Sequence, residues 1–202
     1  EIGRVLERIR ELGLEDDVVV PVLADHGEEF LEHGRHFHGY NAYGEMLNVP
    51  LLLWGPGYVP EGQVIDEITE SIDVMQHLWT GSWPENRAPA IQSVAIEGMS
   101  DPSAVYLRPG DTYHAAVKVA DPDTDPLTFA WDIRPEVKIP PGSYAGNKEK
   151  RAKPIDGLIR DATCKRVEFT APLTQGPYRI FVTVFDGRQH AAYGNVAFLV
   201  TD

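Results

Sequence analysis

The stretch GSWPENRAP, residues 81–89, divides the chain into two parts whose hydrophobic patterns differ. Upstream, apolar residues recur at helical spacing or gather in short unbroken runs, which is typical of α/β domains. Downstream, short segments alternate apolar with polar side chains between turn residues, which is typical of antiparallel strands. The stretch itself is rich in Gly, Pro, Asn and Ser, as linkers are. We therefore predict an α/β domain over residues 1–80, a linker over 81–90 and a β domain over 91–202.

Two helices are predicted in the first domain. Apolar side chains spaced i, i+3, i+4 and i+7 over residues 2–12 predict an amphipathic helix, which Gly13 is placed to cap. A second helix is predicted over residues 71–79, with Ser71 near its N-cap. The inner side of this helix is expected to carry the apolar side chains of Ile72, Met75 and either Leu78 or Trp79.

Two short apolar runs in the same domain predict strands. VVVPVLA, residues 18–24, is of the kind found in strands covered on both faces, although it contains Pro21. NVPLLLWGPG, residues 48–57, ends in a Gly-Pro-Gly turn. Two strands are too few for a doubly wound domain, and the chain opens at Glu1 next to a predicted helix. We expect a piece of a larger α/β domain, poorly soluble by itself because apolar strand faces are exposed.

Charge is distributed very unevenly along the chain. The net charge of −13 lies entirely in residues 1–86, which hold 17 acidic residues, four arginines and no lysine. Nucleic acids and anionic membranes are bound through Lys and Arg, so neither is expected as a partner of this part. No apolar run approaches the roughly 18 residues of a membrane span. The single cysteine, Cys164, excludes an internal disulfide.

Residues 23–40, LADHGEEFLEHGRHFHGY, gather four of the seven histidines among acidic residues. Asp25 and His26 directly follow the first predicted strand, at the end where open α/β sheets place ligand-binding residues. One carboxylate and one imidazole suit a single divalent ion, while a solvated acidic loop is the alternative. A glycosidase pair of carboxylates gains no support from the spacing. The other carboxylates are expected to face solvent or cap a helix turn: Glu28, Glu29 and Glu32.

Several motifs here resemble the sulfatase family of the alkaline phosphatase superfamily. The family carries S/T-D-H-G-E, then E-H-G, then Y-x-E-x-x-x-V-P-L before a strand. The matching segments are Ala24-Asp25-His26-Gly27-Glu28, Glu32-His33-Gly34, and Tyr43-Gly44-Glu45 leading to Val49-Pro50-Leu51. Further along, PEGQVIDEITESIDVMQHL resembles the family's G-x-x-V-D-x-x-x-S-x-x-D-x-x-x-T-L segment. The resemblance spans about residues 1–80 and implies a partial alkaline-phosphatase-like α/β fold.

The resemblance also implies a set of site residues. Asp25 and His26 match a metal-ligand pair, for which Ca²⁺ is preferred to Mn²⁺ or Zn²⁺. His38 matches the catalytic Lys or His that contacts the oxygens of a sulfate or phosphate ester, and this region has no lysine to take that role. The substrate would be such an ester, with a glycan as one carrier, and the location periplasmic or extracellular. Four more residues are expected to hold the loop: His33, His36, Tyr43 and Glu45.

The sequence also departs from the family pattern. The nucleophile motif C/S-x-P/A-x-R and the first Asp-Asp metal pair do not occur in it, and Ala24 replaces Ser or Thr. Cys164 has neither the Pro nor the Arg of the motif and is expected to be a half-buried strand or loop thiol. The reaction needs a nucleophile and a full ligand set, so we expect an inactive fragment of a metal-dependent sulfuric ester hydrolase. Two alternatives remain. The chain could belong to a phosphodiesterase or phosphoglycerol transferase of the same superfamily, or to a non-catalytic scaffold or binding protein.

Residues 91–202 predict six or seven strands in an all-β, immunoglobulin-like sandwich. VADPDTDPLTFAWDI resembles a hairpin of bacterial Ig-like and PKD-like modules that follow catalytic domains in secreted enzymes. Trp131 is expected to be the core aromatic, and three other aromatic side chains are expected near it: Tyr178, Phe181 and Phe185.

Three acidic residues of this hairpin, Asp121, Asp123 and Asp125, are spaced like Ca²⁺ ligands. The glycine and the distal glutamate of an EF-hand loop are missing. We therefore favour a turn held by aspartate side chains over a calcium site.

Overall fold

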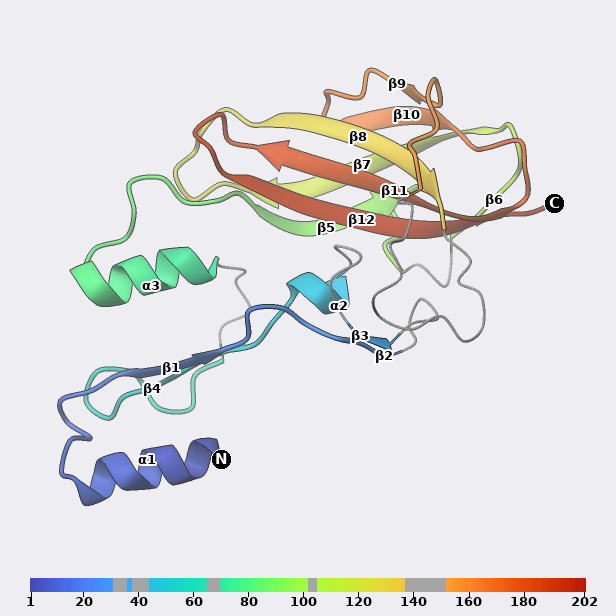
Figure 1. The fold of residues 1–202 in the computed structure, drawn as a ribbon. Coiled ribbons are helices and arrows are strands. Elements are labelled where there is room, and N and C mark those ends of the chain that lie inside the picture. Colours follow the sequence, from blue (N-terminus) through green and yellow to red (C-terminus); the bar gives the residue numbers. More distant parts are fainter. Residues whose placement is uncertain (31–35, 38–43, 65–69, 102–104, 137–151) are drawn as a thin grey trace.

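A computed structural model describes residues 1–30, 36–37, 44–64, 70–101, 105–136 and 152–202 of the chain. Figure 1 shows the helices and short strands of the first part lying to one side of a larger pair of β-sheets formed by the second part. Among the described residues, no helix is long and apolar enough to cross a membrane.

The described portion of the first part contains three helices and two pairs of short strands. In chain order the elements are α1 (Ile2–Glu11), β1 (Val20–Leu23), β2 (Glu29–Phe30), β3 (His36–Phe37), α2 (Gly44–Leu47), β4 (Leu51–Trp54) and α3 (Ser71–Thr80). β1 pairs antiparallel with β4, and β2 pairs antiparallel with β3. The two predicted helices and the two predicted strands are confirmed, with helix and strand ends that differ by a few residues.

In the described residues the first strand is not covered on both faces, as expected for a piece of a larger α/β domain. β1 belongs to a two-stranded sheet, in which its partner is β4. Leu23, Leu52 and Leu53 are 37%, 59% and 40% exposed. Burial on both faces requires neighbouring strands and covering helices, which an apolar run predicts but cannot supply itself. The edge position also explains why Pro21, which has no N–H to donate, is tolerated in β1.

The inner side of α3 is only partly the one its apolar residues predict. Met75 and Leu78 are half-buried as expected, but Ile72 is 67% exposed. Trp79, the alternative to Leu78, is 78% exposed, whereas Asp73 and Val74 are buried. The N-cap is Glu70, one residue before Ser71, and Gly81 ends the helix in the left-handed conformation. Which face of α3 is buried therefore depends on its tertiary contacts. The N-terminus of α3 lies against polar groups of the second part.

The second part is a sandwich of two four-stranded sheets. Its strands are β5 (Ala90–Ile96), β6 (Tyr106–Leu107), β7 (Thr112–Ala120), β8 (Thr128–Pro135), β9 (Ile159–Arg160), β10 (Arg166–Thr170), β11 (Gly176–Phe185) and β12 (Ala191–Val200). One sheet has the order β5-β7-β10-β9 and the other β6-β12-β11-β8. Six or seven strands were predicted, and six of the eight observed strands have five or more residues. The additional strands β6 and β9 have two residues each, too few to show a period of two.

Side chains from the facing surfaces of both sheets form one core. Ile96, Phe169, Ile133 and Ile180 are at most 1% exposed and belong to a single cluster that also holds Trp131. The sheets approach closely where β12 crosses β5, because a Cβ built on Gly194 would lie 2.8 Å from Cγ2 of Val94. A side chain at this position would push the sheets apart, so glycine is required there by packing rather than by its backbone angle.

The expected aromatic group around Trp131 is only partly present. Trp131 and Tyr178 are both 6% exposed and lie in the core. Phe181 and Phe185 point to the opposite face of β11, because side chains alternate along a strand. Phe181 is covered there by Tyr193 and by the guanidinium of Arg134, while Phe185 is 42% exposed.

Candidate functional site

Asp25 and His26 lie directly after β1, as the sequence predicted. Nε2 of His26 is 3.7 Å from Oδ1 of Asp25, and the two side chains are 40% and 90% exposed. Oδ1 of Asp25 also accepts a hydrogen bond from the backbone N–H of His26 (3.1 Å). The two side chains therefore stand next to each other and are open to solvent.

The histidine ring is held by the backbone. Nδ1 of His26 lies 2.8 Å from the carbonyl oxygen of Gly27, which can only accept, so in the neutral ring the proton sits on Nδ1. Nε2 then carries the lone pair that can bind a metal ion, and it is the nitrogen that faces Asp25. The N–H of Gly27 donates to the carbonyl of Met46 (2.8 Å), which ties this turn to α2.

The pair fits two ligands of one divalent ion. Ligand bonds of about 2.0–2.5 Å to a common ion place the two ligand atoms within about 5 Å of each other, and the observed 3.7 Å satisfies this limit. A complete site needs at least four ligands. Within the described residues, no third His, Cys, Asp or Glu joins this pair.

Other predicted residues of the stretch are only partly covered by the structure. His38, His33, Tyr43 and Glu32 lie outside the described residues, and only the backbone is described for His36 in β3 and Glu45 in α2. Glu29 was expected to face solvent or cap a helix turn, which is wrong: it is 1% exposed, while Phe30 beside it is 68% exposed. In the hairpin of β2 and β3, alternation turns Glu29 inward and Phe30 outward.

The predicted aspartate turn between β7 and β8 is confirmed. Oδ1 of Asp121 accepts hydrogen bonds from the backbone N–H groups of Asp123 and Asp125, both at 3.0 Å. Arg87 contacts Asp123, with Nη2 2.8 Å from Oδ1, and its hydrogen bond lowers the pKa of that carboxyl group. The three carboxylates lie close enough to hold an ion, but their hydrogen bonds are those of a structural turn.

Cys164 is exposed in a turn, not half-buried as expected. Its thiol donates a hydrogen bond to Oδ2 of Asp161 (3.3 Å), and this hydrogen bond raises the pKa of Cys164. Nucleophilic cysteines require the opposite shift, since the thiolate is the reactive form. The geometry therefore supports the view that Cys164 is not the nucleophile that the family motif would supply.

Replacing Asp161 with Asn should accelerate alkylation of Cys164 several-fold at about pH 8, because removing the negative charge lowers the thiol pKa and increases the thiolate fraction. Asn is suitable because residue 161 has a φ of 50°, which Asn tolerates. The measurement is the rate of modification by iodoacetamide. Asp156→Asn, at another exposed carboxylate, serves as the control, and equal rates in the two variants would contradict the role given to Asp161.

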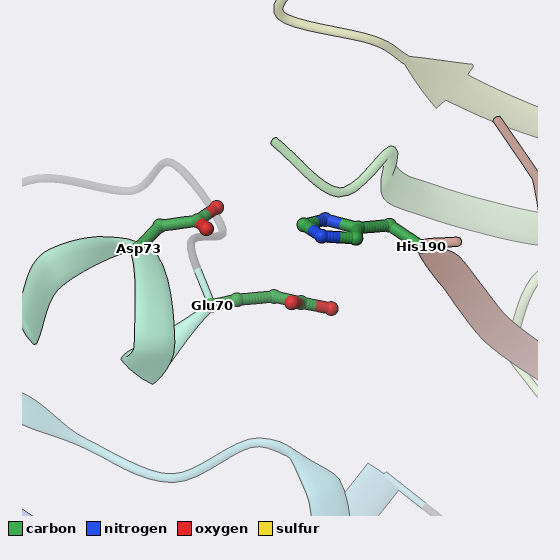
Figure 2. A group of neighbouring side chains, drawn as sticks. All are labelled: Glu70, Asp73 and His190. Atoms are coloured by element: carbon green, nitrogen blue, oxygen red, sulfur yellow. The ribbon is translucent and has the colours of Figure 1, made fainter. Parts of the chain in front are cut away.

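A second polar cluster, which the sequence did not predict, lies between α3 and the sandwich. Glu70, Asp73 and His190 each offer a ligand atom, and these atoms lie within 4.8 Å of one another. Figure 2 shows the two carboxylates extending from the start of α3 toward the His190 ring. Burial raises the pKa values of Glu70 and Asp73. No sequence signal could have indicated this cluster, because His190 is far from the other two along the chain.

Comparisons with known proteins relate the first part to the sulfatases. The Sulfatase family model matches residues 1–80. Arylsulfatase K of Canis lupus familiaris is 30% identical over 73 residues, which cover 36% of this chain and 13% of the relative. The multifunctional alkaline phosphatase superfamily protein PehA of Trinickia caryophylli is 36% identical over 86 residues, covering 40% of this chain and 16% of that protein. These matches fit the expected α/β fold of the alkaline phosphatase superfamily.

One similarity extends beyond the first part. Endo-4-O-sulfatase of Bacteroides thetaiotaomicron is 32% identical over 158 residues, which cover 78% of this chain and 25% of the relative. The chain thus spans a quarter or less of the curated relatives named here. A solved structure, a nucleoside hydrolase-related hypothetical protein from Saccharophagus degradans, aligns with 57% of this chain and 26% of its own at 21% identity and a TM-score of 0.37.

Proposed function

We propose that this chain is a fragment of a metal-dependent sulfuric ester hydrolase of the sulfatase type. Residues 1–80 would be one portion of its catalytic α/β domain, 81–90 a linker, and 91–202 an immunoglobulin-like module. The observation that carries the proposal is the Asp25–His26 pair, located directly after β1 inside the region that matches the sulfatase family. A periplasmic or extracellular location is part of the same proposal.

Each residue has a stated role in this proposal. Asp25 and His26 would hold a divalent ion, preferably Ca²⁺, which supplies positive charge to polarise a sulfate ester and offsets the negative charge of this part. The Gly27 carbonyl fixes the ring of His26 so that Nε2 faces Asp25. His38 would contact a non-bridging oxygen of the ester. The family's nucleophile motif does not occur in these 202 residues, so this chain alone would be inactive.

A phosphate ester is the second candidate substrate. The 36% identity to PehA, a multifunctional protein of the alkaline phosphatase superfamily, is consistent with this candidate. The longer match to Endo-4-O-sulfatase favours the sulfate ester. A scaffold or binding protein that has lost the chemistry is the remaining alternative, and it would make Asp25 and His26 dispensable for metal binding.

Isothermal titration of the chain with Ca²⁺, Mn²⁺ and Zn²⁺ tests the proposal. We expect binding of one of these ions that is lost in the Asp25→Ala, His26→Ala double variant. The matched control is Glu97→Ala, His114→Ala, which removes another exposed histidine–carboxylate pair, with Nδ1 3.2 Å from Oε1 and both side chains 42% exposed. Ca²⁺ binding that persists in the first double variant, or falls equally in both, would favour the scaffold alternative.

A further inference from the structure

The cluster of Glu70, Asp73 and His190 joins the two parts of the chain. Glu70 is the N-cap of α3 and Asp73 lies in its first turn, whereas His190 immediately precedes β12. A ligand atom of each lies within 4.8 Å of those of the other two. Figure 2 shows that the carboxylates approach the imidazole ring from the α3 side.

One of these groups is poorly satisfied where it lies. Asp73, which is only 4% exposed, accepts a hydrogen bond from the backbone N–H of Ala88. Nδ1 of His190 is buried and has no hydrogen-bond partner among the described residues. A buried imidazole nitrogen without a partner is costly, and such an atom calls for an ion, a water molecule or a proton to satisfy it. The ring of His190 faces two carboxylates, which makes a cation the best fit.

The surrounding charges leave this cluster with excess negative charge. Asp186, in the turn after β11, acts on Glu70, and Arg87 and Asp123 act on Asp73. Each nearby arginine already pairs with another carboxylate: Nη2 of Arg87 lies 2.8 Å from Asp123 and Nη1 of Arg188 lies 3.6 Å from Asp125. His190 is therefore the one group within the cluster able to carry positive charge. The raised pKa values of Glu70 and Asp73 reflect burial first and then, for Glu70, the negative charge of its neighbour.

The donor set matches a transition metal. One imidazole nitrogen and two carboxylate oxygens occur together in Zn²⁺ sites, in which a fourth position is held by water. Ligand atoms around such an ion are about 3–3.5 Å apart. The ligand atoms of the cluster lie within 4.8 Å of one another, so the side chains must rotate to bring them closer when the ion binds. Glu70 has three rotatable side-chain bonds and stands at the end of the helix, where such a movement is cheap.

We propose that Glu70, Asp73 and His190 form a binding site for a divalent transition-metal ion that fastens α3 to the β-sandwich. The ion would connect the start of α3 to the turn between β11 and β12, next to the hydrogen bond from Nδ2 of Asn86 to Asp186 (2.6 Å). This site is separate from Asp25 and His26 and does not depend on the function proposed for them.

Zinc titration of the whole chain tests this site. We expect one equivalent of Zn²⁺ to be lost on His190→Ala and kept in the Asp25→Ala, His26→Ala variant. The backbone N–H of His190 donates to Oδ1 of Asp186, and the His190 carbonyl accepts from the backbone N–H of Asp186. Alanine preserves both hydrogen bonds, because they use only main-chain atoms of residue 190. Glu70→Gln, which keeps the shape of the side chain, provides a second variant in case His190→Ala does not fold. Co²⁺ as a second probe should give visible absorption bands that the same variants weaken.

A second readout concerns the fastening itself. Saturating Zn²⁺ should slow amide hydrogen exchange in α3 of the parent chain and leave it unchanged in His190→Ala and Glu70→Gln. Zinc stoichiometry that is identical in the parent and both folded variants would overturn the proposal. Zinc binding without any change in the exchange of α3 would overturn the fastening role. Exchange that responds to acidification and not to Zn²⁺ would assign the cation to a proton on His190 instead.

Discussion

Phe169→Ala is expected to lower the free energy of unfolding of the sandwich by about 4 kcal/mol. Phe169 in β10 is 1% exposed. Its ring lies 6.1 Å from that of Tyr113 in the same sheet and 5.9 Å from that of Phe198 in the opposite sheet, measured between centroids. Truncation removes the contacts of a whole ring and leaves a cavity between two sheets that cannot collapse without moving a strand.

Guanidinium denaturation followed by far-ultraviolet circular dichroism measures this loss. The control is Phe185→Ala, the same substitution at a side chain that is 42% exposed, with an expected cost below about 1 kcal/mol. Similar losses in the two variants would show that the core does not contain Phe169 as described.

Arg179→Ala should lower the free energy of unfolding of the sandwich by about 3 kcal/mol. Nε of Arg179 donates to Oε1 of Glu136 at 2.6 Å, and Nη1 donates to Oδ1 of Asn195 at 2.5 Å. The side chains of Arg179 and Glu136 are 10% and 17% exposed. Removing the guanidinium leaves a largely buried carboxylate without this counter-charge, which costs more than the attraction itself contributes.

The matched control for this prediction is Arg160→Ala. Its Nη1 lies 3.4 Å from Oε1 of Glu168, with side chains that are 83% and 42% exposed, so the expected loss is below about 1 kcal/mol. Arg179→Met keeps most of the side-chain stem and separates packing from charge. If Arg179→Met is as stable as the parent chain, the ion pair contributes nothing and the prediction fails.

The sequence predicted the six longer strands of the sandwich because they alternate apolar and polar residues over several positions. β12, for example, is ten residues long and runs from Ala191 to Val200. The adjacent pair Asp25 and His26 was also accessible to sequence reasoning, because both follow one strand and their relation is local. The structure keeps them side by side.

Other features depended on partners that periodicity cannot identify. The apolar stripe of α3 predicted Ile72 on its inner side, yet Ile72 is exposed and Asp73 is buried. Asp73 is buried because polar groups of the sandwich, above all His190, lie against the start of the helix. In β11 the alternation was read correctly as a strand, but which aromatic side chains reach Trp131 depended on which face the opposite sheet covers.

The sequence by itself determined the local elements, the position of Asp25 and His26 after a strand, and the resemblance of residues 1–80 to the sulfatases. These properties follow from residues that are neighbours along the chain or within one repeat of a helix or strand. Only the tertiary structure decided which faces are buried and that Glu70 and Asp73 meet His190. Contacts between residues far apart in the chain depend on how whole elements pack, and no local pattern records that.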